Sequence, residues 1–361
     1  MKILGIESSC DETAAAVVEN GRRLLSNVVH SQIDIHAEYG GVIPEIAARN
    51  HIEVVNVVIK KALEEAECTW DDVDAIAVTY APGLIGSLLV GTLAARTLAI
   101  LKNKPLYAIH HVEAHVYANF ITTKNDTLTY TLPKNQPQFP MLALIVSGGH
   151  SQLVLFRAHG DYRLLGQTQD DAVGEAFDKV AKILGLPYPG GPAIATTALD
   201  GDPTTYPLPK AKLKNPYDFS YSGLKTAVLR AVQREVGVDH TFPSGGLAER
   251  LNDVQKANFA ASFQYTAVKT LVDATQAAYN EFQPTSVVIA GGVAANQELR
   301  RQLSDRLPLP IEYAPMQLCT DNAAMIATLG YYYAQVKQSD DPYALEVIPS
   351  ISMDETAWAS A

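Results

Sequence analysis

The stretch KILGIESSCDETAAAVVENGRRLLSNVV, residues 2–29, decides the fold. It reads as three β-strands joined by two short turns, the second at residues 20–21, because apolar runs are separated by small polar residues and glycine. The stretch PMLALIVSGGHSQLVLFRAHGDYRLLGQT, residues 140–168, repeats this scheme, with turns at residues 147–149 and near Gly160. Two similar three-stranded meanders in one chain predict two similar lobes.

Each meander is followed by a further strand, a glycine turn and a helix. DAIAVTYAPGLIGSLLVGTLAARTLAIL covers residues 74–101 in the first half, and TSVVIAGGVAANQELRRQL covers residues 285–303 in the second. Neither stretch matches G-x-G-x-x-G or G-x-x-x-x-G-K-[ST], so neither a Rossmann nor a Walker nucleotide site is indicated. Glycine-rich turns between strands, one in each half, present backbone N–H groups that suit phosphate oxygens. This arrangement resembles the actin, Hsp70 and sugar-kinase superfamily, in which ATP lies between two duplicated lobes.

We therefore expect an α/β fold of two duplicated lobes of the actin, Hsp70 and sugar-kinase type, with a nucleotide cleft between them. At 361 residues the chain exceeds the usual size of one domain. The predicted N-terminal lobe covers residues 1–121, with the helix of residues 321–337 returning to it, and the C-terminal lobe covers residues 138–318. The polar stretch 122–140 reads as an exposed loop, and the tail 338–361 has no recognisable motif.

Composition narrows the class of protein. Hydrophobic residues make up 47% of the chain, which is typical of a soluble globular protein. The three cysteines are too few and too scattered for a disulfide framework, and Glu7 interrupts the apolar N-terminal run, so we expect neither a signal peptide nor a membrane span there. A cytoplasmic protein is expected. The net charge of −11 argues against nonspecific nucleic-acid binding by the whole surface.

One local stretch departs from this acidic balance. Between Tyr206 and Glu235, six basic residues stand against two acidic ones, a local excess of four positive charges. The basic residues are Lys210, Lys212, Lys214, Lys225, Arg230 and Arg234. Such a run is usually a solvated face, and the alternative is a strip that contacts phosphates.

Two histidines stand four residues apart in HHVEAHVYA, residues 110–118, which reads as helix. An α-helix turns about 100° per residue, so His111 and His115 share one face and can share a metal ion. The H-E-x-x-H motif of metalloproteases has the same spacing but needs glutamate directly after the first histidine, where this chain has Val112. Glu113 lies roughly 200° round the helix from His111 and points away from that face. Spacing alone leaves open a metal site or two histidines that cap or line a helix.

Eight segments of the chain occur in the order of one protein family. They are HAEYGGVIPEIAARNHIE (36–53), APGLIGSLLVG (81–91), HHVEAH (110–115), VSGGHSQLV (146–154), DDAVGEAFDKVAKILGLPYPGGP (170–192), FSYSGLKTAV (219–228), AGGVAANQELR (290–300) and CTDNAAMIA (319–327). The chain closely resembles the tRNA N6-adenosine threonylcarbamoyltransferases, the bacterial TsaD family once described as glycoproteases or O-sialoglycoprotein endopeptidases. The resemblance covers residues 1–335, and several of the motifs are long enough to be highly specific.

The resemblance implies a transferase that modifies tRNA. Members of the family transfer a threonylcarbamoyl group from threonylcarbamoyl-adenylate to N6 of the adenosine 3′ to the anticodon in tRNAs that read ANN codons, and AMP is released. The bacterial members work with a TsaB-like pseudo-paralogue and a TsaE-like ATPase. A small-molecule kinase or ATPase of the same superfamily is the first alternative, but it has no reason to carry His111, His115 and Asp321 together. A metalloprotease is a weaker alternative, since Val112 stands where its general base is required.

The metal and catalytic residues are also implied by the resemblance. The metal ligands would be His111 and His115 of HHVEAH and Asp321 of CTDNAAM. Two imidazoles and one carboxylate suit Fe(II) and are tolerable for Zn²⁺, so one divalent metal is expected, with Fe(II) favoured. Asp11 and Glu12 of ESSCDET are the candidates for catalytic support. The alternative is that these two acids only order the turn.

The resemblance places the adenylate, an ATP- or AMP-type nucleotide, on a third set of residues. These are Ile145, Val146, Ser147, Gly148, Gly149, Asp178, Gly191 and Asn296. Asp178 suits ribose hydroxyls because a carboxylate accepts two hydrogen bonds, and Gly191 lets the base or ribose approach the backbone. The alternatives are a helix-surface charge and a turn glycine. Some family members carry aspartate four residues after that glycine, where this chain has Ala195.

Overall fold

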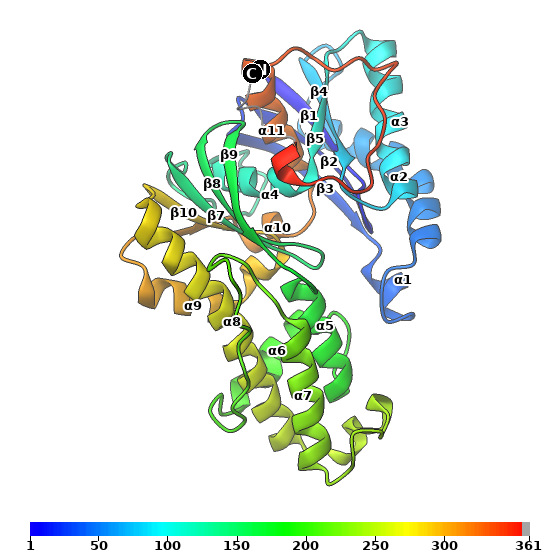
Figure 1. Cartoon of the computed structure of the whole chain (residues 1–361). Helices are drawn as coiled ribbons and strands as arrows, with labels where there is room; N and C mark the ends of the chain where they lie inside the picture. Colours follow the sequence, from blue (N-terminus) through cyan, green and yellow to red (C-terminus); the bar gives the residue numbers. More distant parts are fainter. Residues whose placement is uncertain (356–361) are drawn as a thin grey trace. The chain divides into compact units, whose positions relative to one another are not determined.

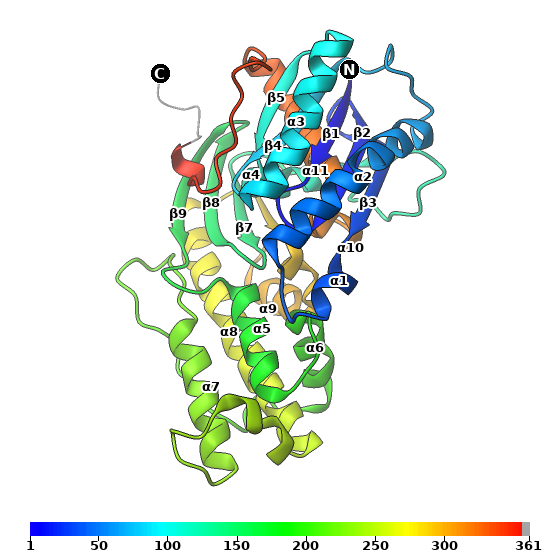
Figure 2. The same ribbon diagram turned by 90° about the vertical axis from the view of Figure 1, so that its right-hand side faces the viewer.

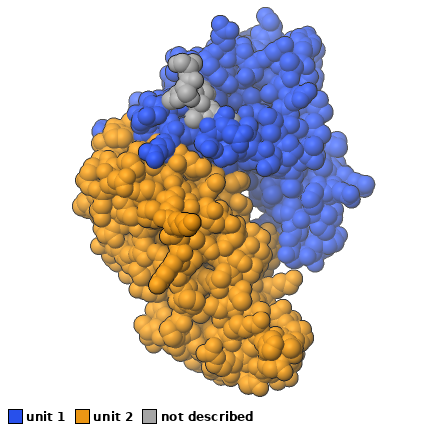
Figure 3. Space-filling model, in the orientation of Figure 1, with its two compact units in different colours: residues 1–138, 156–163, 312–361 blue, residues 139–155, 164–311 orange. Residues whose placement is uncertain are grey.

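The computed structural model describes residues 1–355 (Figure 1) and divides into two compact units (Figure 3). Unit 1 consists of Met1–Gln138, Phe156–Arg163 and Glu312–Ala361, and unit 2 consists of Phe139–Leu155 and Leu164–Ile311. The last six residues of the predicted tail, 356–361, lie outside the described residues. Both units contain a sheet with helices packed against it, which is the mixed α/β composition that the sequence predicted.

Unit 1 is built on a six-stranded sheet with the strand order β5-β4-β1-β2-β3-β6. Its strands are β1 (Lys2–Glu7), β2 (Glu12–Glu19), β3 (Arg23–Ser31), β4 (Ala75–Ala81), β5 (Leu106–His110) and β6 (Thr123–Lys124). β1, β2 and β3 are antiparallel neighbours, and β4 and β5 continue the sheet in parallel with β1. The turn predicted at residues 20–21 joins β2 to β3, and both of its residues have positive φ angles.

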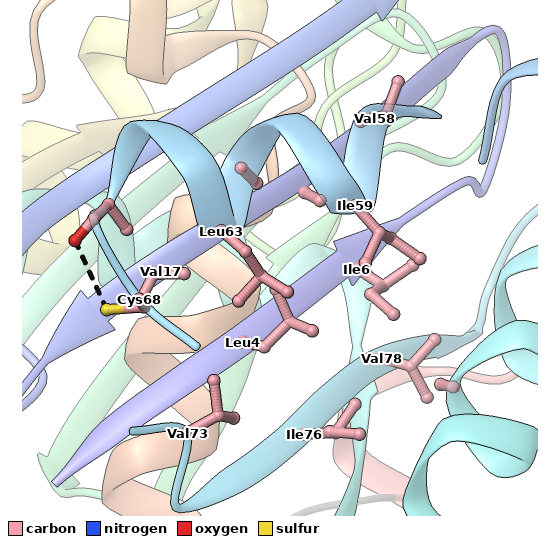
Figure 4. Close-up of a cluster of buried hydrophobic side chains, with 14 of the residues drawn as sticks. Leu4, Ile6, Val17, Val58, Ile59, Leu63, Cys68, Val73, Ile76 and Val78 are labelled. Atoms are coloured by element: carbon pink, nitrogen blue, oxygen red, sulfur yellow. Dashed lines mark hydrogen bonds between the residues drawn. The ribbon is translucent and has the colours of Figure 1, made fainter. Parts of the chain in front are cut away.

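Helices cover both faces of this sheet. α2 (Pro44–Glu65) and α3 (Ile85–Lys102) lie over one face, as Figures 1 and 2 show. Alternate strand residues such as Leu4 and Ile6 point to these two helices and form one buried apolar cluster with them (Figure 4). The other residues of each strand, which alternate with these, point to the opposite face of the sheet. There α11 (Ala323–Val336) packs against β1, β2 and β4.

α11 approaches the sheet closely at two glycines. A Cβ atom at Gly5 would lie 2.3 Å from the carbonyl oxygen of Ala323 and 2.7 Å from the backbone nitrogen of Ala327, and one at Gly330 would lie 2.5 Å from the Cβ of Ala77. No side chain fits at either position, so the helix rests almost directly on the sheet. The helix begins toward the carboxyl end of β1. Because β1, β4 and β5 are parallel, their carboxyl ends meet at this same edge.

Unit 2 is built on a second sheet with the strand order β11-β10-β7-β8-β9. Its strands are β7 (Met141–Val146), β8 (Ser151–Ala158), β9 (Asp161–Gln167), β10 (Ser286–Ala290) and β11 (Ile311–Tyr313). In each sheet the first three strands are neighbours in chain order, and the next strand lies beside the first, parallel to it. The predicted duplication is therefore confirmed by the strand order.

One long helix organises the helical part of unit 2. α8 (Asp253–Phe282) contacts α5 (Val173–Leu184), α6 (Gly190–Thr197), α7 (Ser222–Glu235) and α9 (Gln297–Arg306). Its N-terminus carries a capping box, in which Asn252 and Gln255 each bind the other's backbone N–H group. Buried aromatic side chains along α8 then join it to its neighbours, for example Phe263 to Phe177 with ring centroids 5.0 Å apart.

α3 is the one helix among residues 1–355 that is long and apolar enough to cross a membrane, with a mean hydropathy of 1.5. A third of the helix is buried in the structure, where it packs against α2 and β4. Core helices of soluble proteins pass the same test, so α3 is weak evidence for a membrane span.

Replacing Gly5 by alanine should destabilise unit 1. The added methyl group would collide with the backbone of α11, and overpacking of this kind costs about 1–3 kcal/mol of unfolding free energy. Urea denaturation followed by circular dichroism measures the change. Gly223→Ala in α7 is the matched control, because a Cβ atom there meets nothing within 4 Å. Equal unfolding midpoints for the two variants would contradict the close approach of α11 to β1.

Candidate functional site

The two histidines of HHVEAH lie on a short buried helix at the edge of the unit 1 sheet. α4 (His111–Tyr117) begins directly after β5, and the ring of His110 caps it by accepting a hydrogen bond from the backbone N–H of Glu113 at 3.4 Å. The Nε2 atoms of His111 and His115 lie 3.2 Å apart, and both side chains are buried. The helical spacing predicted from the sequence therefore places both imidazoles on one face.

Asp321 completes this cluster from the other end of the chain. It stands just before α11, and its Oδ1 atom lies 3.2 Å from Nε2 of His115 and 3.5 Å from Nε2 of His111. The three donor atoms all lie within 4.8 Å of one another. Donor atoms that bind one ion at about 2.0–2.2 Å lie about 3 Å apart, so these three residues fit a metal ion.

Glu7 supports the cluster from the end of β1. The carboxylate is fully buried, and its Oε2 atom lies 3.0 Å from Nδ1 of His111 and accepts a hydrogen bond from Thr79 at 2.5 Å. Its Oε1 atom accepts a hydrogen bond from the backbone N–H of Ser9. A carboxylate on Nδ1 holds the imidazole with Nε2 turned toward the other ligands, as in many metal sites. Our sequence reasoning missed Glu7, although an acid that ends a buried apolar strand was a usable signal.

The cluster is strongly coupled by charge. Burial opposes protonation of His111, but the Asp321 and Glu7 carboxylates outweigh burial and hold the pKa of the imidazole well above its ordinary value. Burial alone would raise the pKa of the Asp321 carboxyl, but His111 and His115 hold it well below its usual range. In the absence of a metal ion, a proton bound to His111 thus supplies the positive charge between the Asp321 and Glu7 carboxylates.

Asp11 and Glu12, the predicted catalytic acids, lie in the same unit as this cluster. Burial, followed by the nearby carboxylates of Asp321 and Asp11, raises the pKa of Glu12 to about 9. Ser31 donates a hydrogen bond to Glu12 at 3.1 Å. Carboxylates outnumber cationic groups at this edge of the sheet, and this excess of negative charge favours the binding of a divalent cation.

In unit 2, the predicted phosphate turn follows β7. Ile145 and Val146 are the buried end of that strand, and residues 147–149 form a partly exposed turn closed by a hydrogen bond from the backbone N–H of Ser147 to the carbonyl of His150. A Cβ atom added to either glycine of the turn would meet nothing within 4 Å. The N-terminus of α5 packs against the other side of the turn, so close to Ser147 that only glycine fits at position 174. The turn thus has one supported face and one open face.

Asp178, on α5, lies beside the start of α6, where Gly191 is the second residue. Oδ1 of Asp178 accepts a hydrogen bond from the backbone N–H of Gly190 at 2.7 Å. Burial raises the pKa of Asp178, although this hydrogen bond opposes the rise. A Cβ atom at Gly191 would meet open space, and Ala195 follows it in the next turn of α6. The aspartate therefore orders the beginning of α6 beside an open backbone position.

Asn296 occupies the turn after β10. Because β10 and β7 are parallel neighbours, their following turns lie at one edge of the unit 2 sheet. The side chain of Asn296 is already engaged within the protein: it accepts a hydrogen bond from the backbone of Leu299 at 3.0 Å and donates one to Gln264 at 2.9 Å. It caps α9 and ties it to α8, which is the structural alternative to direct contact with a nucleotide.

Comparison with curated proteins gives one consistent result. The TsaD family model, described as tRNA N6-adenosine threonylcarbamoyltransferase, matches residues 23–328. The chain is 52% identical over 342 residues to the tRNA N6-adenosine threonylcarbamoyltransferase of Thermomicrobium roseum, a match that covers 93% of this chain and 92% of that protein. It is 49% identical over 353 residues to the protein of the same name from Dehalococcoides mccartyi, covering 98% and 99% of the two chains.

Solved structures show the same fold at low sequence identity. Full-length HypF in a phosphate- and nucleotide-bound form superposes with a TM-score of 0.57 at 12% identity, covering 94% of this chain and 47% of that chain. The HypF of T. kodakarensis gives a TM-score of 0.55 at 14% identity, covering 92% and 48%. These proteins have the actin-like ATPase and sugar-kinase fold, so the predicted fold class is confirmed.

The three predicted metal ligands all fall inside the residues that the family model matches. The kinase and metalloprotease alternatives find no support among these relatives. The family model matches most of the chain, and relatives are about half identical to it along nearly their whole length. The chain therefore belongs to the TsaD family of tRNA N6-adenosine threonylcarbamoyltransferases.

Proposed function

We propose that this protein transfers the threonylcarbamoyl group of threonylcarbamoyl-adenylate to N6 of the adenosine 3′ to the anticodon in tRNAs that read ANN codons, releasing AMP. Family membership and the names of its relatives support the reaction. The convergence of His111, His115 and Asp321 carries the proposal, because a kinase or ATPase of this fold needs no such ligand set. Since the substrate is tRNA, we place the protein in the cytoplasm.

One divalent metal, Fe(II) in preference to Zn²⁺, would be held by Nε2 of His111, Nε2 of His115 and the carboxylate of Asp321. When bound, the ion supplies a Lewis acid that polarises the threonylcarbamoyl group. Two imidazoles and one carboxylate leave further coordination positions open to a substrate. With the ion bound, Glu7 would accept a hydrogen bond from Nδ1–H of His111, and the lone pair of Nε2 would bind the ion.

The reaction forms one bond between N6 and the carbamoyl carbon and breaks the bond from that carbon to the phosphate oxygen of AMP. The attacking amine loses a proton, and a carboxylate beside the reacting carbon can accept it. We propose Asp11 and Glu12, where the turn after β1 leads into β2, as the catalytic residues that support this step, with Asp11 as the proton acceptor because a pKa of about 9 keeps Glu12 protonated at neutral pH. The amine is a weak nucleophile and AMP is a good leaving group, so correct positioning contributes most of the rate.

We propose that residues 145–149, Asp178, Gly191 and Asn296 bind the adenylate. The open face of the turn at residues 147–149 supports this, because its backbone N–H groups can approach phosphate oxygens without obstruction. Asp178 would accept a hydrogen bond from a ribose hydroxyl beside the open backbone of Gly191. Asn296 would act by shaping its loop, since both ends of its amide are bonded within unit 2.

TsaB-like and TsaE-like proteins are proposed as partners. α3 exposes three apolar side chains at helical spacing, Ile85, Leu89 and Leu93, which are between 41% and 58% exposed. Contiguous exposed apolar residues mark protein interaction surfaces more often than chance. This row supports unit 1 as the contact surface for the TsaB-like pseudo-paralogue.

The basic stretch proposed for tRNA is partly neutralised in the structure. Lys210 and Lys225 each form an ion pair with an aspartate at 2.8 Å, and Arg230 donates a hydrogen bond to a backbone carbonyl. Lys212 and Lys214, which lie between Lys210 and Lys225 in the sequence, are exposed. Arg234 is also exposed. We therefore propose that the tRNA contact in this stretch rests on Lys212, Lys214 and Arg234 rather than on all six basic residues.

Replacing any one of His111, His115 and Asp321 by alanine should remove the metal and nearly abolish transfer, because two ligands cannot hold the ion in place. Metal content of the purified variants is measured by elemental analysis, and transfer by AMP release that requires both threonylcarbamoyl-adenylate and tRNA. His30→Ala, at an exposed histidine of unit 1, is the control and should keep both metal and activity. Full metal content in the His111→Ala and His115→Ala variants would exclude the site.

Metal affinity should rise with pH. Burial opposes protonation of His111, but Asp321 and Glu7 hold its pKa well above the ordinary value, so a proton competes with the metal at neutral pH. Below that pKa, affinity should increase by up to about tenfold per pH unit, because one proton is displaced, and it should level off above it. Titration with Zn²⁺ from roughly pH 6 to pH 8 tests this, and a flat profile would exclude competition at His111.

Changing Lys212 and Lys214 to serine together should weaken binding to all tRNA sequences alike. Each lost phosphate contact should flatten the dependence of log affinity on log salt by about 0.7–0.9. The measurement is tRNA affinity from low to moderate salt. Lys60→Ser with Lys61→Ser on α2 removes the same charge from unit 1 and is expected to leave the slope unchanged. Equal slopes for the two pairs would exclude the unit 2 contact.

A further inference from the structure

Glu113 is a buried acid that the proposed chemistry does not use. It lies on α4 between the two histidine ligands in sequence, and its side chain is fully buried. Its Oε2 atom accepts hydrogen bonds from the hydroxyl of Tyr333 at 2.9 Å and from that of Tyr162 at 3.1 Å, while Oε1 has no hydrogen-bond partner. A buried carboxyl group with one unsatisfied oxygen costs stability.

Helix α11 and the segment that leads into it hold α4 at two separate points. Asp321 precedes the helix and meets the histidine face of α4, whereas Tyr333, in the last turn, meets Glu113. Tyr333 lies ten residues beyond the start of α11 at Ala323, which corresponds to about 15 Å, so the two attachments are far apart along α11. Since Glu113 stands roughly 200° from His111 round the helix, they also act on opposite faces of α4.

A second attachment on the opposite face controls the rotation of α4 about its own axis. An imidazole nitrogen lies roughly 6 Å from the axis of its helix, so a roll of about 10° moves it by about 1 Å. Metal–ligand distances must hold within about 0.2 Å. If α4 were held only at its histidine face, it could roll about its axis, and the metal site does not tolerate the resulting displacement of the ligand nitrogens.

We propose that Glu113 is a positioning residue for the metal site, which locks the rotation of α4 through its hydrogen bond from Tyr333 so that His111 and His115 converge with Asp321. This inference rests on the metal site proposed above. In this role Glu113 acts on the side of α4 away from the metal. It therefore does not need the position directly after the first histidine that the glutamate of a metalloprotease occupies.

The two tyrosines should contribute unequally. Tyr162, at the tip of the β8–β9 hairpin, has a single hydroxyl proton but two acceptors in reach, Glu113 at 3.1 Å and the carbonyl of Met353 at 3.0 Å. Tyr333 lies closer to the carboxylate, at 2.9 Å. Tyr333→Phe should therefore reduce metal affinity more than Tyr162→Phe.

The test is Zn²⁺ affinity, measured by competition with a chelator on the folded full chain. Tyr333→Phe removes only a hydroxyl and should weaken Zn²⁺ binding by about tenfold, the low end of the loss seen for residues that orient metal ligands. Glu113→Gln should bind nearly as the unsubstituted protein does, because one amide oxygen can accept both tyrosine hydrogen bonds. Thr328→Val is the matched control on α11, since its buried hydroxyl has no hydrogen-bond partner, and it should change nothing.

The outcomes separate this inference from the proposed function. If Tyr333→Phe binds Zn²⁺ as tightly as the unsubstituted protein while His111→Ala does not bind it, the metal site stands and the role of Glu113 is wrong. If Thr328→Val loses as much affinity as Tyr333→Phe, the effect is a general loosening of α11 and the role is equally wrong. If the unsubstituted protein binds no metal, the site and the positioning role fail together.

Discussion

Helix α11 rests on β1 with no side chain between the two backbones at Gly5, and the geometry of unit 1 depends on that contact. It sets the height of α11 above the sheet and therefore the position of Asp321 just before it. β5 ends at the same edge, so the first residue of α4 is delivered to the same place by an independent element. The three ligands come from two segments, α4 and the residues before α11, and they converge because the end of β5 and the start of α11 lie at this same edge of the sheet.

The charges at this edge are arranged around a cation. Glu7 and Asp321 both face His111, and burial, followed by the nearby carboxylates of Asp321 and Asp11, raises the pKa of Glu12 to about 9. Such crowding destabilises a folded protein unless a positive charge offsets it. A divalent ion bound by the imidazoles would offset it, and protons take that role without the ion. Binding of a cation, the protonation of Glu12 and the stability of unit 1 are in this way linked.

The sequence predicted the regular parts of this molecule well. Turns rich in glycine and small polar residues marked both meanders, and the spacing of His111 and His115 placed them on one helical face. Asp321 was found only through resemblance to a family, since it is 206 residues beyond His115 and no local pattern joins them. Glu7, the bond between Glu113 and Tyr333 and the ion pair of Lys210 were missed for the same reason. Each depends on elements distant in sequence that meet only after folding.

The return of α11 from the C-terminal part of the chain has a consequence for synthesis. The strands of unit 1 leave the ribosome first. One face of their sheet, including Gly5, stays uncovered until unit 2 and then α11 have been synthesised. An incomplete chain cannot assemble the ligand set and exposes apolar sheet surface instead. Binding of the proposed metal would then require that translation has passed α11, so a nascent or truncated chain would remain inactive and would be open to recognition by chaperones and proteases.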